Sequence, residues 1–87
     1  MEINFEETRK FFEEIREISK KIKEDKDIEK CRKFREEWRQ KIFSAALMIE
    51  KLEDEKRFGE IEKLEEEFPD EFSAARNQLQ WLQAWAK

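Results

Sequence analysis

Carboxylate pairs at helical spacing are the commonest groups in this sequence that could do acid–base chemistry. Glu13 with Glu17, and Glu62 with Glu66, lie four residues apart, so in a helix the members of each pair share a face. The chain holds 23 Asp and Glu among 87 residues, and such pairs therefore arise without a catalytic purpose. No histidine is present to complete a catalytic triad, a zinc site or a Glu-x-x-His di-iron centre. We therefore expect no enzyme activity, no cofactor and no metal.

The single cysteine, Cys31, is the only other candidate nucleophile of note. Lys30 and Arg32 flank it, and nearby cations activate thiols. No partner base accompanies it, and one cysteine forms no disulfide within the chain. Because Cys31 falls on the apolar stripe of a predicted helix, we interpret it as a small buried apolar residue.

Basic residues gather between residues 20 and 41, where ten Lys and Arg face six Asp and Glu. Basic side chains near Phe34 and Trp38 could bind nucleic acid. However, the chain carries a net charge of −4, and both aromatic residues fall on the predicted core stripe. Four oppositely charged pairs lie four residues apart and can neutralise one another within a helix: Arg32–Glu36, Lys33–Glu37, Glu29–Lys33 and Glu37–Lys41. We therefore expect no nucleic-acid binding.

Two tryptophans near the end of the sequence favour a binding surface. Trp81 and Trp85 lie one helical turn apart, and residues 72–86 carry a single charge, Arg76. Tryptophan is enriched at binding hot spots, and neutral amides provide adaptable hydrogen bonds around it. We predict a surface for a protein partner, formed by this segment and by two apolar residues of the preceding long helix: Trp81, Trp85, Gln78, Ala74, Asn77, Phe43 and Leu47.

Other interpretations of these surfaces stay open. The two indoles could pack inside the domain, or the same surface could join two copies of the chain in a homodimer or scaffold. The acidic segment 60–71 could mimic phosphate and occupy a basic groove of a target. The composition, rich in Glu and Lys with no Val, Tyr or His, is compatible with a designed sequence and with a natural one.

The elements that must position these residues are helices. Apolar residues recur at helical spacing, while Gly and Pro occur once each, leaving little turn chemistry for a sheet. We predict an all-α fold, a small antiparallel helical bundle of three long helices plus one short helix, in a single domain of residues 1–87. The expected helices run from after Asn4 to Lys23, from Ile28 to Arg57 with Gly59 as the stop, over residues 60–68, and from Pro69 or Asp70 to Ala86.

The predicted core lies where the apolar stripes of these helices meet. The stripe of the second helix begins at Ile28 and includes Cys31 and Phe34. Eight residues are expected to be central: Phe12, Ile15, Ile18, Trp38, Ile42, Ile49, Leu79 and Leu82. No apolar run approaches the 18 or so residues of a membrane span, and the first residues lack the pattern of a secretory signal. We therefore expect a soluble, cytoplasmic protein with no membrane partner.

Overall fold

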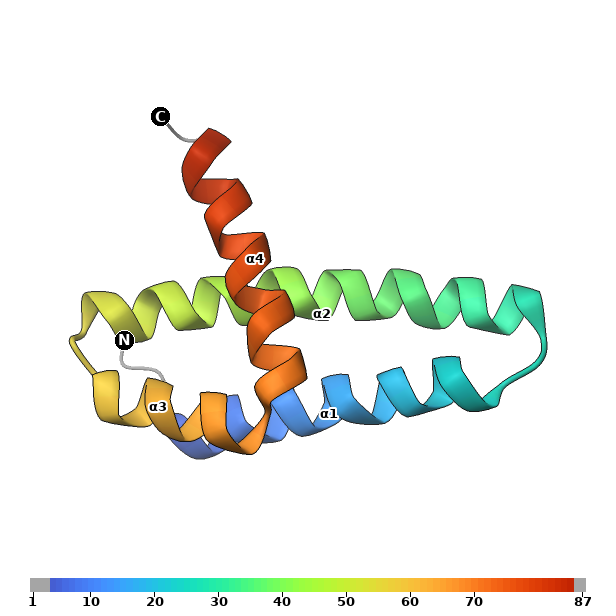
Figure 1. Cartoon of the computed structure of the whole chain (residues 1–87), viewed down its shortest axis with the longest axis horizontal. Coiled ribbons are helices and arrows are strands. Elements are labelled where there is room, and N and C mark those ends of the chain that lie inside the picture. Colours follow the sequence, from blue (N-terminus) through green and yellow to red (C-terminus); the bar gives the residue numbers. More distant parts are fainter. Residues whose placement is uncertain (1–3, 86–87) are drawn as a thin grey trace.

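A computed structural model describes residues 4–85, which form four α-helices and no strand (Figure 1). The helices are α1 (Phe5–Glu24), α2 (Ile28–Asp54), α3 (Phe58–Glu67) and α4 (Pro69–Trp85). The all-α prediction of three long helices and one short one is confirmed. The predicted end of the last helix at Ala86 lies outside the described residues.

The first two helices begin where the sequence predicts, because a polar side chain caps each of them. The Asn4 side chain accepts hydrogen bonds from the backbone N–H groups of Glu6, at 2.9 Å, and Glu7. The Asp27 carboxylate accepts from the N–H of Glu29, also at 2.9 Å. Each cap satisfies N–H groups that have no partner within the helix, which fixes the first turn.

The end of α2 differs from the prediction. The helix ends at Asp54 rather than at Arg57, and Lys56 adopts the left-handed conformation, with φ of 60°. The N–H of Arg57 then bonds to the carbonyl of Leu52 at 2.9 Å, which closes a Schellman-type turn. Gly59 has no positive φ and lies within α3. Lys56, rather than Gly59, therefore provides the left-handed residue that ends α2.

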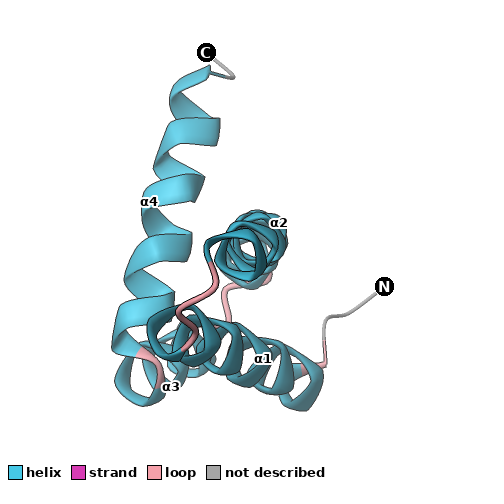
Figure 2. Cartoon of the chain, turned by 90° about the vertical axis from the view of Figure 1, so that its right-hand side faces the viewer, coloured by secondary structure: helices cyan, strands magenta, loops and turns pink. Residues whose placement is uncertain are grey.

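Helices α1 and α2 form an antiparallel hairpin, and α4 lies across it rather than alongside (Figure 1). The crossing divides the hairpin into two halves. One half, with the start of α1 and the end of α2, is covered by α3 and by the base of α4. The other half, near the loop between α1 and α2, extends beyond them. Seen along the hairpin, α4 continues past α2 and projects from the bundle (Figure 2).

The core sits where α4 crosses the hairpin. Its buried residues come from all four helices, and the rings of Phe12 and Phe68 stack with their centroids 5.7 Å apart. The other members are Ile15, Ile42, Ala45, Ala46, Ile49, Leu52, Ile61, Leu64, Phe72, Ala75 and Leu79. Burying these side chains supplies the main driving force for the fold.

Two of the eight residues that were predicted to be central lie at the edge of the core. Trp38 and Leu82 are only partly buried against the cluster, although both were expected to be central. Trp38 lies in the half of α2 that α4 does not cross, and Leu82 lies where α4 leaves the bundle. Ile28 was expected on the apolar stripe but is 76% exposed, because it begins α2 beyond the end of α1.

Arginine side chains fasten the covered half. Nε of Arg16 donates to the Glu71 carboxylate at 2.9 Å and its Nη2 donates to the carbonyl of Glu67 at 2.7 Å. The same guanidinium stacks 4.5 Å from the centroid of the Phe68 ring. Arg9 donates to the Glu67 carboxylate at 2.8 Å. These contacts join α1 to the junction of α3 and α4.

Among the described residues, no helix has the length and apolarity of a membrane span.

Candidate interaction surface

The outer half of α4 carries the two tryptophans. The inner half packs on α2 through Ala75 and Leu79, both buried. Beyond this contact α4 leaves α2 behind (Figure 2), and Trp81 is 65% exposed while Trp85 is 80% exposed. Positions four residues apart differ by about 40° around a helix, so the two indoles lie on adjoining parts of one face.

The other predicted residues of α4 surround the indoles on the same helix. Asn77 is exposed, whereas Ala74 and Gln78 are half-buried, with Ala74 packed against the core. Asn77 and Trp81, together with Gln80 and Ala84, line a shallow hollow of about 380 Å³. We call Ala74, Asn77, Gln78, Trp81 and Trp85 the tryptophan face.

The other two predicted residues belong to α2. Phe43 and Leu47 are 42% and 47% exposed and lie one turn apart. In the described part of the chain no ring contact joins Phe43 to either indole. The five predicted residues of α4 therefore share one face of that helix, and Phe43 and Leu47 form an exposed patch on α2.

The charge of Arg76 is turned away from the indoles. Its guanidinium pairs with Glu53 of α2 at 3.3 Å and stacks 5.2 Å from the centroid of Phe72. The tryptophan face is consequently uncharged. Its apolar side chains lie next to the amide groups of Asn77 and Gln78. Such a surface favours a partner that buries aromatic rings and meets the amides with hydrogen bonds.

Cys31 has a different environment from the one expected. It is half-buried near the loop between α1 and α2, and its Sγ donates to the carbonyls of Asp25, at 3.2 Å, and Ile22, at 3.6 Å. Carbonyls at the end of a helix lack partners within it. The thiol thus helps to close the end of α1, a structural role.

The basic segment does not neutralise itself as the sequence suggests. None of the four predicted pairs within α2 is present among the described residues. Lys41 pairs instead with Glu14 of α1, with 3.0 Å between Nζ and the carboxylate. Phe34 and Trp38 are half-buried, so neither offers an open ring for stacking on a nucleotide base.

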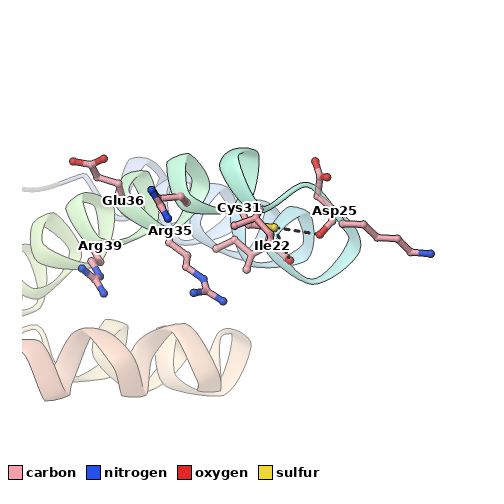
Figure 3. Close-up of a pocket in the computed structure, with 9 residues that line it drawn as sticks. Ile22, Asp25, Cys31, Arg35, Glu36 and Arg39 are labelled. Atoms are coloured by element: carbon pink, nitrogen blue, oxygen red, sulfur yellow. Dashed lines mark hydrogen bonds between the residues drawn. The ribbon is translucent and has the colours of Figure 1, made fainter.

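Sequence reasoning missed a groove at the exposed half of the hairpin. It has a volume of about 610 Å³, and three arginines from one face of α2 line it: Arg32, Arg35 and Arg39 (Figure 3). Their spacing of three and four residues was the signal that could have revealed this shared face. Two carboxylates, those of Asp25 and Glu36, also line the groove.

The acidic segment 60–71 contains both paired and exposed carboxylates. Glu67 and Glu71 pair with arginines of α1, and Glu60 pairs with Arg57. The hydrogen bond from Arg9 and the charge of its guanidinium lower the pKa of Glu67 below its ordinary value, and burial opposes the shift. Glu62, Glu65 and Glu66 are exposed. Phe58, at the start of the same helix, is 57% exposed and could not be singled out from the sequence.

Comparisons with protein-family models, with curated proteins and with solved structures give no significant match. The surfaces are therefore interpreted from their chemistry. Within residues 4–85, no three side chains of His, Cys, Asp or Glu converge as metal ligands. The candidate features are the tryptophan face, the patch of Phe43 and Leu47, and the groove on the hairpin.

Proposed function

We propose that this chain is a non-enzymatic protein-binding module that presents its tryptophan face to a protein partner. One observation carries the proposal: the outer half of α4 projects from the bundle with Trp81 and Trp85 largely exposed. The bundle holds the inner half of α4 in place, so the face is presented on a rigid element. A rigid presenting helix lowers the entropy that association costs.

The energetics of exposed indoles support this use. Indole rings are large apolar surfaces with one hydrogen-bond donor, and a monomer gains nothing by leaving two of them in water. A partner that covers both would gain a large apolar contact without first moving any charge. The neutral amides of Asn77 and Gln78 lie at the border of the same face and can pair with polar groups of the partner.

The patch of Phe43 and Leu47 extends the proposal to α2. Both side chains are close to half exposed on the helix that α4 crosses. A partner that wraps around the projecting part of α4 would meet α2 next. We propose that these two residues form a secondary contact, weaker than the indoles.

The experiment compares three proteins as affinity baits: wild type, W81A/W85A and the control Q83A. Gln83 is also exposed on the outer half of α4, but on the side of that helix opposite to Ala74 and Trp85. A true partner is captured by wild type and Q83A and lost with W81A/W85A. With that protein purified, the double substitution should raise Kd by more than about tenfold, since hot-spot residues cost ~2 kcal/mol or more.

Folding of the variants decides between a surface and a core role. Because both indoles are exposed, W81A/W85A should change the free energy of unfolding by less than about 1 kcal/mol. A loss of several kcal/mol would contradict the proposal and make the indoles structural. Equal capture of every protein by wild type and W81A/W85A would contradict it as well. Loss of self-association alone in W81A/W85A would identify the partner as a second copy.

A further inference from the structure

The arginines of this chain fall into two groups. Four of the seven pair with carboxylates: Arg9, Arg16, Arg57 and Arg76. The other three, Arg32, Arg35 and Arg39, have no hydrogen bond or ion pair in the described part of the chain. All three line the groove on the hairpin. A guanidinium group can bind a carboxylate through two parallel hydrogen bonds. Three such groups that line one groove without a carboxylate partner therefore form a candidate binding site.

The groove combines these charges with an apolar floor. Ile22 and Ile28 line it beside the arginines, and Ile28 is 76% exposed. Figure 3 shows Arg35 and Arg39 extending from the same side of α2, and both are exposed. A ligand that fits this groove has an apolar side chain for the floor and carboxylates for the guanidinium groups. An acidic amphipathic helix has both.

Helix α3 of the same chain offers that combination on its exposed face. Phe58 is 57% exposed, and Glu62 and Glu66 follow it at intervals of one turn. Glu65 is exposed beside them, and none of the three carboxylates has a partner in the described structure. At ~1.5 Å per residue, residues 58–66 span about 12 Å and the arginines about 10 Å, so the two arrays match in length.

We infer that the groove binds α3 of a second copy of this chain. Within one molecule the contact is impossible, because α3 and the groove lie toward opposite ends of the long axis (Figure 1). In the pair of molecules, Phe58 of one copy lies on Ile22 and Ile28 of the other. The carboxylates of Glu62 and Glu66 then meet the guanidinium groups of the groove, which fixes the register.

Nucleic acid fits the groove less well. A phosphate backbone has no apolar side chain to cover Ile22 and Ile28, whereas α3 brings Phe58. The nearby aromatic residues, Phe34 and Trp38, are half-buried, and Lys21 lies 5.7 Å from the ring centroid of Phe34. Neither ring is therefore open for a base to stack on it. The inference uses a different surface from the tryptophan face and stands independently of the proposed function.

Charge reversal tests the contact in the full chain. Sedimentation from micromolar to millimolar concentration should show wild-type association that weakens as salt is added. R35E/R39E and E62R/E66R should each raise the dissociation constant by about tenfold or more. An equimolar mixture of the two variants should associate as wild type does, since each reversed groove meets a reversed α3. K30E/K33E, which makes the same charge change on the opposite side of α2, should associate normally.

Cys31 provides a second measurement, because the only cysteine of the chain lines the groove. Its alkylation by a maleimide should slow as the wild-type concentration rises, and not in R35E/R39E. The inference is overturned if wild type stays monomeric throughout, or if the mixed variants fail to associate while wild type does. It is also overturned if W81A/W85A abolishes association and R35E/R39E leaves it intact.

Discussion

The two halves of the α1–α2 hairpin differ in environment and, along α2, in composition, since residues 28–41 carry nine charges and residues 42–49 none. In the covered half, α3 and the base of α4 form a second layer, and Ile42 of α2 is 4% exposed. In the open half, Trp38 is only partly buried and Ile28 is 76% exposed. Arginines follow the same division, paired in the covered half and uncommitted in the open one. Along this one continuous helix, the uncharged part that α4 crosses is therefore core, and the charged part is surface.

The strongest test of this difference uses one substitution at two places on α2. Ile42→Ala should cost about 2–5 kcal/mol, since it removes buried methylenes and leaves a cavity. Ile28→Ala should change stability by less than about 0.5 kcal/mol, because its side chain is already in water. Urea unfolding with equal m-values measures both. Similar losses at the two positions would mean that the open half is covered in solution.

The next effect concerns the ion pair beneath α4. Glu71 is 7% exposed, and it accepts a hydrogen bond from Arg16 at 2.9 Å. Glu71→Gln should cost about 1–2 kcal/mol, because the partly exposed Arg16 guanidinium loses the countercharge of a buried carboxylate. The matched control is Glu17→Gln in α1. Glu17 forms an exposed ion pair with Lys20, and such a pair contributes little to stability. Equal effects of the two changes would contradict a special role for the covered pair.

Local sequence signals predicted the helices well. The exposure of individual residues and the groove depend on long-range packing, which the sequence does not show directly. Caps such as Asn4 act within a few residues, so the start of α1 was readable from the sequence. The partial exposure of Trp38 depends on where α4 crosses, which no short segment encodes. The tryptophan face could be proposed from two tryptophans one turn apart in a segment with a single charge. The groove could not, because ion pairs expected for Arg32 within α2 do not form in the described structure.

The turn between α2 and α3 also differs from what the sequence predicts, and it provides a test with a smaller expected effect. Lys56 holds a positive φ, which an L-residue adopts at a cost, whereas Gly59 sits in a helix with open space around its Cβ position. Lys56→Gly and Gly59→Ala should each stabilise the fold by about 0.5–1 kcal/mol. Lys56→Ala, which keeps the strain, should bring no gain. Thermal unfolding measures all three, and a loss on Lys56→Gly would contradict the left-handed turn.

The smallest expected effect is a pH dependence at the link between α1 and α3. The hydrogen bond and charge of Arg9 lower the pKa of Glu67 below its ordinary value of 4.5. The unfolded chain therefore binds this proton more readily than the folded one, so the link stabilises the fold above pH 4.5 and loses this contribution as the pH falls through the lower folded value. Glu67→Gln should flatten the fall in the urea midpoint at acidic pH. Glu66→Gln is the control, an exposed neighbour without a partner in the described structure. Identical pH profiles for the two variants would show that Arg9 does not hold Glu67 in solution, and that the covered half is fastened by Arg16 and by apolar packing.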